Sequence, residues 1–583
     1  KMLENARRLR KGIPGCPKVE MTSGLDFFKR LGERVKDNKH LPKWVSELYL
    51  EYHRGTYTTM GRSKRYNRKA EFLYHDLEVL AVISDVATAK HEYPKEALRK
   101  GWKVILLNQF HDIIPGTSIE EVYEESYAQY EELLEEGKKT QNKLLDVIAC
   151  NIQSKGLSVM AMNTLGHKRN DLVYVDLEEL PNHAYAVLYE GERYPLQRLD
   201  GGIGIFYGRN MPGSGYRTYT LVEEEGKREN QLIVKKDHLE NPFFVLKLNE
   251  KGQITSIYDK KAQREIIHTE KPANVFQAFE DKPHKWDAWD INIYYQEKMW
   301  EIDELEEIEV VAVGPVRGTL KIRYRYMDSI ILQYIHIYQD MDRIDFETEI
   351  DWKETHTLLK VAFPVDVHTN KATYDIQYGN VERPTHWNTS WDVARFEVCG
   401  HKWADLSEEG YGISLLNDCK YGYDIKDSVM RLSLLKSSTW PHPTADKEKH
   451  LFTYAIYPHM GNVKQGNTIE MGYQLNVPAI GKLIPPQEGN LTEDYSLVEL
   501  DQRNVFIESI KEAEDDDAMI LRLYEAMHQR GFVTMRLNVN VDKVFLCNLL
   551  EENIEEVQVN NHILTFEIKP YEIKTFKVYK SKR

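Results

Sequence analysis

Cysteine is scarce in this chain, and the few cysteines present do not form a framework. Five cysteines are spread over 583 residues, and no two of them stand in C-x-x-C spacing. A secreted disulfide scaffold and a cysteine-rich zinc ribbon are therefore excluded. This usage suits a reducing cytosol, so we expect a cytoplasmic protein.

Long apolar runs and an excess of positive charge are also missing. No stretch approaches the roughly 20 apolar residues of a membrane-spanning helix, so a membrane partner is not expected. The net charge of -15 opposes binding to nucleic-acid phosphates. One local basic cluster is interpreted as the solvated start of a helix; it consists of Arg62, Lys64, Arg65, Arg68 and Lys69.

Several signatures of enzyme chemistry are absent from the sequence. There is no glycine-rich phosphate loop, no G-x-S-x-G elbow and no H-E-x-x-H zinc helix. The chain opens on KMLENARRLRKGIPG, without an initiator methionine at position 1, and shows no signal peptide there. A length of 583 residues with 42% hydrophobic residues predicts several separate cores.

The first 150 residues have the 3.6-residue period of helices. Thr22 and Ser23 are candidate caps for a helix through GLDFFKRLGERVKD. Apolar spacing predicts further helices at 61–91, at 95–112 and from 118 to about 149. For the last helix, Ser118 and Glu121 have the spacing of a capping box. Each of these three helices has an apolar stripe, so a three-helix bundle is predicted.

After about residue 154 the pattern changes to β-branched and aromatic runs separated by Gly, Asn, Asp and Pro. Examples are LVYVDLEEL, GTLKIRYRYM and FVTMRLNVNV. This pattern is typical of large antiparallel β-sandwiches, with subdomain seams at about 230 and 485. The predicted fold class is therefore multidomain α+β, a three-helix bundle followed by large antiparallel β-sandwich (supersandwich) domains.

Residues 43–59, KWVSELYLEYHRGTYTT, alternate apolar and polar positions as a strand does. The stretch also carries Glu47 and Glu51, and a carboxyl group beside an apolar wall can serve as a general acid. The pattern alone favours the simpler alternative, a half-exposed edge strand with charged outer positions.

A second stretch, LLNQFHDIIPGTS at 106–118, places His111 beside Asp112 just before a Pro-Gly helix stop. A helix end can present such a pair to a cleft. The alternative is a histidine that satisfies a nearby carbonyl and an aspartate in solvent, and spacing alone favours that alternative.

Two aromatic loops are candidates for sugar contacts, HKWDAWDI at 284–291 and THWNTSWD at 385–392. Tryptophan rings stack on the apolar faces of pyranose sugars, and neighbouring Asp and Asn accept hydroxyl protons. Buried tryptophan plugs are an equally good interpretation.

The segments ELYLEYHRGTYTT, KRYNRKAE and NQFHDIIPGTSI together closely resemble glycoside hydrolase family 38 α-mannosidases of the bacterial and cytosolic type. The resemblance continues through HKWADLSEEGYGISLLNDCKYGYD and IKPYEIKTF, and so spans essentially the whole chain. It implies a zinc-dependent retaining enzyme that hydrolyses terminal α-mannosyl residues of oligosaccharides. In that family a β/α catalytic domain precedes a three-helix bundle and several β-sandwich domains.

The resemblance also implies roles for individual residues. His111 matches a zinc ligand, and Asp112 matches a residue that contacts mannose hydroxyls. Counting back from the glycine of RGTYTT gives Glu47 as the general acid/base, with Glu51 as the runner-up. Retention needs two carboxyl groups roughly 5 Å apart, one nucleophile and one acid/base.

One part of the family pattern is not found. Family members carry a His-x-Asp pair and a nucleophilic aspartate that also binds zinc, and no His-x-Asp occurs in these 583 residues. We therefore expect the nucleophile and the other zinc ligands upstream. The predicted division is 1–60, the end of the catalytic domain and a strand leading on; 61–153, the bundle; 154–230, a small β-sandwich; 231–485, the supersandwich; and 486–583, a C-terminal β domain.

Other functions remain open at this stage. A non-catalytic carbohydrate-binding or scaffold fragment would hold sugar on its tryptophan loops without cleaving it. A different sandwich-based glycosidase or lyase would share only the β region, and the motifs at Glu47 and His111 argue against it. Family likeness alone favours a homodimer, and the residues show no interface.

Overall fold

The computed structural model of the protein describes residues 1–88, 92–224, 230–268 and 270–581. It divides into two compact units, Lys1–Leu50 and Glu51–Arg583. The fold class predicted from the sequence is confirmed: helices come first, and antiparallel sheets follow. No disulfide joins the five cysteines, all of which lie in the described part, and none of the helices described there has the length and apolarity to cross a bilayer.

The first unit contains α1 (Met2–Arg10) and α2 (Gly24–Val35). The helix predicted through GLDFFKRLGERVKD is confirmed, and it ends at Val35, two residues before the predicted end. Its cap is Ser23, whose hydroxyl accepts a hydrogen bond from the backbone N–H of Asp26 at 3.1 Å. Thr22 lies one residue outside the cap position.

The strand predicted over 43–59 is wrong. Residues 51–57 form two short 3-10 helices, η1 (Glu51–His53) and η2 (Gly55–Tyr57), and no strand is assigned to 43–50. Alternation of apolar and polar residues does not produce a strand where no neighbouring strand pairs with the segment. Instead, the backbone N–H of Gly55 donates to the carbonyl of Trp289 in an irregular loop, at 2.8 Å.

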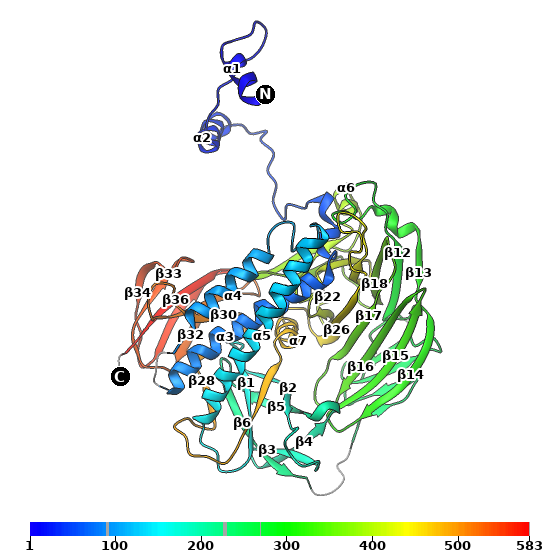
Figure 1. Ribbon diagram of the computed structural model, residues 1–583, viewed down its shortest axis with the longest axis vertical. Coiled ribbons are helices and arrows are strands. Elements are labelled where there is room, and N and C mark those ends of the chain that lie inside the picture. The colour runs from blue at the N-terminus through cyan, green and yellow to red at the C-terminus, as the bar shows by residue number, and fades with distance from the viewer. Residues whose placement is uncertain (89–91, 225–229, 269, 582–583) are drawn as a thin grey trace. The chain divides into compact units, whose positions relative to one another are not determined.

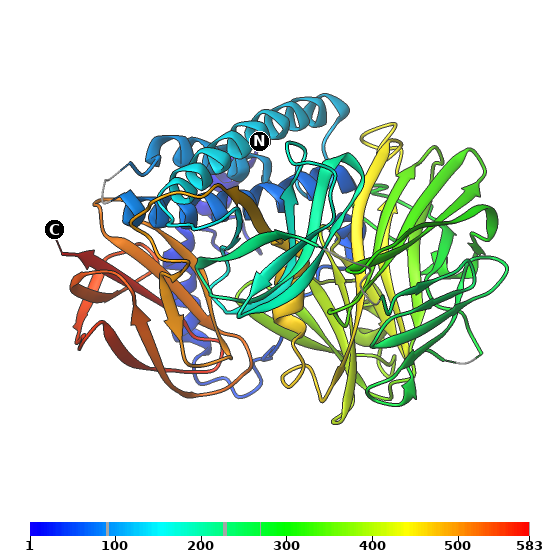
Figure 2. The ribbon, with the colours of Figure 1, turned by 90° about the horizontal axis from the view of Figure 1, so that it is seen from below.

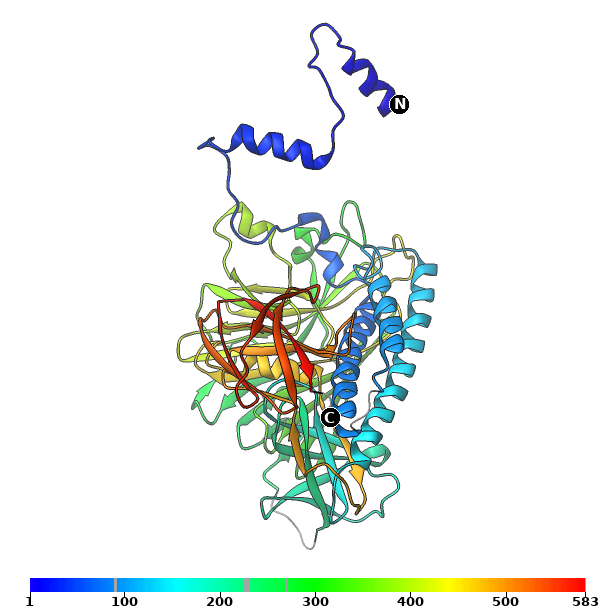
Figure 3. The same ribbon diagram turned by 90° about the vertical axis from the view of Figure 1, so that its left-hand side faces the viewer.

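In the second unit, η1 and η2 are followed by the predicted helices α3 (Gly61–Thr88), α4 (Lys95–Asn108) and α5 (Glu120–Cys150). The three helices lie side by side and share one apolar core (Figures 1 and 3). Members of that core that are buried include Leu77, Leu98, Ile105 and Tyr130.

Three details of the bundle differ from the prediction. Helix α4 ends at Asn108, four residues before the predicted end, and a turn carries the chain onward. Helix α5 has Ile119 at its N-cap, with no side-chain cap. The predicted cap, Ser118, instead donates its hydroxyl to the carbonyl of Asp112 at 2.9 Å. The last residues of the helix predicted at 61–91 lie outside the described residues.

The basic cluster at the start of α3 was expected to be solvated, and this interpretation is wrong for its central residues. Lys64 is 4% exposed and Arg68 is 2% exposed. The guanidinium of Arg68 stacks on Tyr421 and donates to its hydroxyl at 2.9 Å, while Lys69 pairs with Asp418 at 2.9 Å. These partners come from the β region, which packs over the N-terminal half of α3.

After the bundle, the described chain forms a closed sheet in which β1 pairs with both β27 and β6. Its order is β1-β27-β2-β5-β4-β3-β6-β28. The strands are β1 (Ser158–Asn163), β2 (Arg169–Asp176), β3 (Tyr185–Tyr189), β4 (Glu192–Arg198), β5 (Ile203–Met211), β6 (Gly215–Glu223), β27 (Ala479–Ile484) and β28 (Asp494–Ser496). The late strands β27 and β28 thus return to an early sheet. The five-part domain division stays a prediction.

Further sheets of the described chain, one of them larger than this one, are formed by its middle part (Figure 2). One has the order β14-β15-β16-β17-β26-β23-β22-β19-β20, and it is accompanied by β13-β12-β18-β25-β24-β21 and β11-β10-β9-β8-β7. The bounds are β7 (Ile233–Val234), β8 (His238–Glu240), β9 (Phe244–Leu248), β10 (Ile254–Asp259), β11 (Arg264–Glu265), β12 (Val275–Glu280), β13 (Met299–Glu301), β14 (Glu304–Val313), β15 (Arg317–Tyr326), β16 (Ser329–Tyr338), β17 (Ile344–Asp351), β18 (Thr357–Pro364), β19 (Lys371–Ile376), β20 (Gly379–Pro384), β21 (Val398–Cys399), β22 (Trp403–Ser407), β23 (Tyr411–Asn417), β24 (Gly422–Lys426), β25 (Val429–Lys436) and β26 (Lys449–Met460). Between them lie η4 (Ile293–Glu297), α6 (Ser390–Ala394) and α7 (Thr468–Asn476).

The last strands form two small sheets that pack beside the C-terminal half of α3, orange and red in Figure 2. They are β29-β32-β35 and β30-β31-β36-β33-β34. The bounds are β29 (Val498–Leu500), β30 (Val505–Glu512), β31 (Met519–Glu525), β32 (Gly531–Leu537), β33 (Val541–Cys547), β34 (Asn553–Val557), β35 (Ile563–Ile568) and β36 (Ile573–Lys580). A shared core of Val79, Ile83, Ile507 and Leu521 joins α3 to these sheets.

Candidate active site

Residues 109–118, here called the His-Asp turn, follow the C-terminal end of α4. The Nε2 atom of His111 lies 3.3 Å from Oδ2 of Asp112. The imidazole is 75% exposed and the carboxylate 43% exposed, so the pair faces solvent. The turn therefore presents an imidazole nitrogen and a carboxylate oxygen, both able to ligate a metal, at one point of the surface.

The turn is held rigidly around Asp112. The carboxylate Oδ1 accepts from the hydroxyl of Thr117 at 2.8 Å, which leaves Oδ2 toward His111. The carbonyl of Asp112 accepts from the Thr117 N–H at 3.1 Å and from the hydroxyl of Tyr123 at 3.2 Å. The sequence pattern did not indicate this role for Tyr123.

The turn also docks closely on the segment that precedes α3. Gly116 has a φ of +93°, and a Cβ there would lie 2.5 Å from the carbonyl oxygen of Thr59. Only glycine combines this backbone conformation with so close an approach. The RGTYTT and HDIIPGTS segments, separated along the sequence, are thus brought into contact.

A buried lysine joins the two segments. Lys64 donates its Nζ to the carbonyls of Thr59 at 2.5 Å and Ile114 at 2.9 Å. Burial lowers the pKa of Lys64, and the nearby Asp446 carboxylate opposes that effect. The sequence alone gave no sign of this role, because both acceptors are backbone groups.

Asp446 organises the start of α3. Its carboxylate oxygens accept from the backbone N–H groups of Met60 and Gly61, each at 2.7 Å. A carboxylate at a helix N-terminus satisfies otherwise unpaired donors and complements the helix dipole. Asp446 lies over 380 residues away along the chain, so the sequence pattern did not reveal it.

Among the described residues, one group of three possible metal ligands is compact, with Asp446, Glu448 and His450 offering atoms within 4.8 Å of one another. These groups do not fit zinc well. Asp446 is already used by the backbone of α3, and Glu448 pairs with Arg62 at 3.0 Å. The buried ammonium groups of Lys64 and Lys420 act on Asp446 and disfavour a cation beside it. We interpret this group as structural.

Arg54 ties the same segment to the aromatic loops. Its guanidinium donates twice to the carbonyl of Ala394, at 2.8 and 3.1 Å, and stacks on Phe396 at 4.4 Å. It also pairs with Asp290 at 3.4 Å. Nothing in the sequence indicated this role for Arg54.

The first tryptophan loop forms an aromatic cluster. The rings of Trp286 and Trp289 lie 5.8 Å apart, and Trp440 lies 5.4 Å from Trp289. Trp286 is 50% exposed and Trp440 is 52% exposed, so the cluster offers ring surface to solvent. Trp440 was not singled out in the sequence.

The aspartates of both tryptophan loops bind protein groups. Asp287 accepts from the backbone N–H of Thr439 at 2.6 Å, and Asp290 pairs with Arg54. Asp392 accepts from the backbone N–H and hydroxyl of Thr389 in a capping box. These carboxylates shape the loops, and sugar binding by the loops stays a prediction.

The two candidate acid/base residues lie in different units. Glu47 is half-buried in the first unit, where its carbonyl accepts from the indole N–H of Trp44 at 3.0 Å. Glu51 is in the second unit with His111 and Asp112, and its carboxylate is 58% exposed and 3.8 Å from the Arg54 guanidinium. Their catalytic roles stay predictions.

Comparison with known families gives three matches along the chain. The alpha mannosidase middle domain matches residues 51–148, which contain the His-Asp turn. The glycosyl hydrolases family 38 C-terminal domain matches 239–444, and the family 38 C-terminal beta sandwich domain matches 504–576. The chain is also 34% identical to alpha-mannosidase 2C1 of Homo sapiens, over 94% of this chain and 51% of that protein.

This chain belongs to glycoside hydrolase family 38.

Other members are similar along the same length. The family 38 chain is 33% identical to alpha-mannosidase G of Dictyostelium discoideum, over 97% of this chain and 55% of that protein. Its fold is similar to that of an alpha-mannosidase from Enterococcus faecalis V583, with a TM-score of 0.80 and 16% identity over 99% of this chain and 74% of that one. The chain spans about half the length of the curated relatives it matches.

Proposed function

We propose that this chain is part of a zinc-dependent retaining α-mannosidase that hydrolyses terminal α-mannosyl residues of oligosaccharides. The observation that carries the proposal is the His-Asp turn, which exposes His111 and Asp112 at a fixed point where two family segments meet. The relatives named alpha-mannosidase support the same substrate class.

His111 is the proposed zinc ligand. Neutral imidazole and carboxylate oxygen are donors that zinc accepts in proteins. A ligating histidine commonly donates its second ring N–H to a carboxylate, which fixes the ring. With Nε2 directed to Asp112, the Nδ1 of His111 remains to face a metal. Bound zinc would supply orientation of sugar hydroxyls and stabilisation of charge.

Asp112 is the proposed contact to the mannose hydroxyls. Thr117 holds its Oδ1, so the carboxylate cannot rotate freely. Such preorganisation lowers the cost of orienting a sugar ring. The acid/base is proposed to be Glu47, with Glu51 as the runner-up. The nucleophile and the remaining zinc ligands are proposed to come from polypeptide outside these 583 residues, because no His-x-Asp occurs within them.

One observation favours a second candidate function. The exposed cluster of Trp286, Trp289 and Trp440 offers faces on which pyranose rings can stack. A fragment that binds carbohydrate without cleaving it would need no nucleophile. Turnover separates the two candidates.

The test is hydrolysis of 4-nitrophenyl α-D-mannoside by two preparations, the 583-residue chain alone and the same chain joined to a family 38 N-terminal segment with the His-x-Asp pair. We expect turnover only from the joined form, with loss on chelation and recovery on adding zinc. No turnover from the joined form would favour the carbohydrate-binding candidate. Chelator-resistant turnover would contradict the zinc requirement.

The acid/base assignment needs its own measurement. Glu47→Gln is expected to slow substrates with poor leaving groups more than activated aryl mannosides, because protonation of the leaving oxygen matters most for poor leaving groups. If Glu51→Gln slows substrates with poor leaving groups selectively and Glu47→Gln does not, the alignment that assigned the acid/base to Glu47 is wrong. A cytoplasmic location, a homodimer and the lack of nucleic-acid binding all stay predictions.

A further inference from the structure

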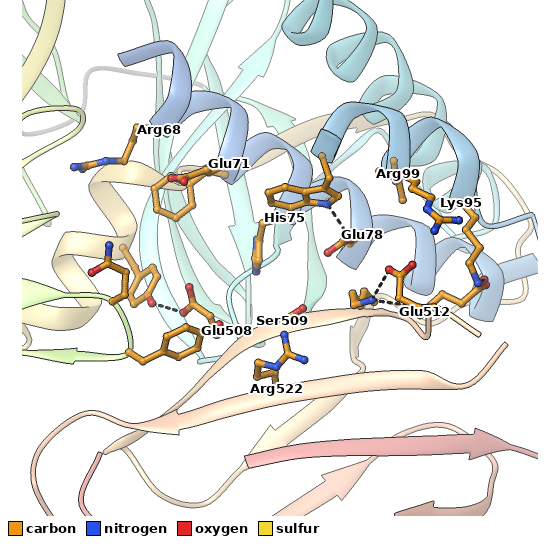
Figure 4. A pocket seen from close by; sticks show the side chains of 18 of the residues that line it. Arg68, Glu71, His75, Glu78, Lys95, Arg99, Glu508, Ser509, Glu512 and Arg522 are labelled. Carbon is orange, nitrogen blue, oxygen red and sulfur yellow. Dashed lines mark hydrogen bonds and ion pairs between the residues drawn. The ribbon is translucent and has the colours of Figure 1, made fainter. Parts of the chain in front are cut away.

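A hollow lies where α3 packs against the C-terminal sheets, and neither His111 nor Asp112 lines it. Its volume is about 510 Å³, within the roughly 300–1,000 Å³ of small-molecule sites. Figure 4 shows α3 and α4 on one side and β30 on the other. Glu71 and Glu78 on α3 lie roughly 15 and 26 Å along the helix from Gly61, given its rise per residue.

The walls combine aromatic rings with hydrogen-bonding groups of both kinds. Trp102, Phe72 and Tyr378 supply ring surface. Glu71, Glu78 and Glu508 supply carboxylate oxygens, while Lys402, Lys511 and Arg522 supply nitrogen donors. Because acceptors and donors are mixed, the hollow does not select for a ligand of one charge.

The three carboxylates are positioned by protein donors. Trp102 donates its indole N–H to Glu78 at 3.0 Å, and Tyr473 donates its hydroxyl to Glu508 at 2.6 Å. A carboxylate accepts on both of its oxygens, so each can also serve a ligand hydroxyl. Fixed carboxylates beside aromatic faces are the chemistry that a pyranose ring requires, with hydroxyls at its edge and C–H groups on its faces.

The hollow is linked to the His-Asp turn by a short path. Glu71 accepts a hydrogen bond from Nε2 of Gln109 at 2.7 Å. Gln109 is the C-cap of α4 and stands two residues before His111. Glu78 accepts from Trp102 and so holds the same helix about two turns before Gln109. Two wall residues therefore hold α4, and one of them, Glu71, does so where the turn begins.

We propose that this hollow binds a neutral, monosaccharide-sized sugar, and that its occupancy restrains the His-Asp turn through Glu71 and Gln109. The proposed sugar binding does not depend on the proposed function, whereas any effect of the sugar on turnover rests on that function.

The binding half is tested by calorimetric titration of the 583-residue chain with methyl α-D-mannoside and methyl β-D-glucoside, up to about 10 mM. We expect saturable binding of at least one sugar, weakened at least about tenfold in Glu78→Gln and in Glu508→Gln. Glu409→Gln, an exposed carboxylate outside the hollow, is the matched control and is expected to bind as the wild type does.

A third variant separates the hollow from the His-Asp turn. Asp112→Asn is expected to keep the binding that Glu78→Gln loses. If Asp112→Asn alone weakens binding, the sugar sits at the turn, which overturns the inference while supporting the proposed function. No binding of either sugar also overturns it.

The coupling half is measured by amide hydrogen exchange, without turnover. Saturation with the sugar that binds is expected to slow exchange in residues 111–118 of the wild type, and to have no such effect in Gln109→Ala. Exchange in the wild type that does not change on saturation would overturn the coupling. Because no catalysis is measured, failure of the proposed function does not affect this result.

Discussion

The dipeptide His-Asp occurs twice in the helical region, and the two copies have different surroundings. His75 and Asp76 lie within α3, where their side chains are 19% and 11% exposed. His111 and Asp112 lie after α4, where the same side chains are 75% and 43% exposed. In each pair, the imidazole and the carboxylate approach to 3.3 Å.

The difference lies in what else each aspartate holds. Asp76 accepts a hydrogen bond from the hydroxyl of Thr164 at 2.6 Å. Thr164 directly follows β1, so Asp76 joins α3 to the β region. Within the part of the chain that the structure describes, Asp112 accepts only from groups of its own turn and the start of α5. Its partners fix the turn and leave the pair facing outward. The same two residues are structural within a helix and candidates for chemistry at its end.

The largest expected effect is on turnover at the exposed pair. In a preparation that hydrolyses 4-nitrophenyl α-D-mannoside, Asp112→Asn is expected to lower kcat/KM about 1,000-fold, equivalent to about 4 kcal/mol of transition-state stabilisation. The reason is loss of the fixed carboxylate that we propose orients the sugar and the imidazole. A fall of less than tenfold would remove Asp112 from the site.

The next effect tests how the turn is held. Gly116→Ala is expected to lower the free energy of unfolding by about 3 kcal/mol, because it adds a clash with Thr59 to the cost of a positive φ. Gly191→Ala is the matched control: its φ is +82° and no atom lies within 4 Å of the added Cβ. We expect about 1 kcal/mol there by urea unfolding. Equal losses would show that the contact with Thr59 is unimportant.

The surroundings of the buried pair are expected to make the stability of the fold depend on pH, mainly through Glu78, whose charge interacts with His75. Burial raises the pKa of Glu78 to about 7, so the folded protein binds more protons than the unfolded chain between about pH 4.5 and 7. Stability from this group is therefore lost as the pH rises through that window, by about 2 kcal/mol between pH 5 and 7. Burial lowers the pKa of His75, but the hydrogen bond and charge of Asp76 outweigh burial, so the pKa of His75 is raised. His75 therefore also contributes stability that is lost as the pH rises.

Glu78→Gln tests this dependence by thermal or urea unfolding at several pH values. The variant is expected to show a flatter fall in stability between pH 5 and 7 than the wild type. A slope that matches the wild type would contradict the raised pKa of Glu78. The site carboxylate variant Asp112→Asn serves as a comparison on an exposed group.

The smallest effect distinguishes the two aspartates directly. Asp76→Asn is expected to lower the free energy of unfolding by about 1 kcal/mol, because the amide keeps one acceptor for Thr164 but loses the charge beside His75. Turnover measured well below the melting temperature is expected to stay at the wild-type value. A large loss of turnover in Asp76→Asn, with stability intact, would mean that the two pairs are not different in kind.

Much of the fold was predictable because its causes are local. The 3.6-residue period predicted α3, α4 and α5, and the hydroxyl of Ser23 predicted the start of α2. The prediction of local structure failed where a contact with another segment determines the conformation. Ser118 binds Asp112 instead of capping α5, and the residues around Gly55 bond to a loop more than 200 residues away.

The candidate site shows the same division. His111 and Asp112 could be found because motif and helix stop are adjacent in sequence. Lys64 could not, because its acceptors are carbonyls and its burial depends on the β region. Asp446 could not, because its contact with Met60 and Gly61 joins opposite parts of the chain.

The most direct test of the central claim is the zinc content of the purified joined form, compared between the wild type, His111→Ala and His75→Ala after dialysis against a weak chelator. We expect about one zinc per chain in the wild type and in His75→Ala, and a large loss of zinc in His111→Ala. Equal zinc in His111→Ala and the wild type would contradict the claim that the exposed pair provides a zinc ligand.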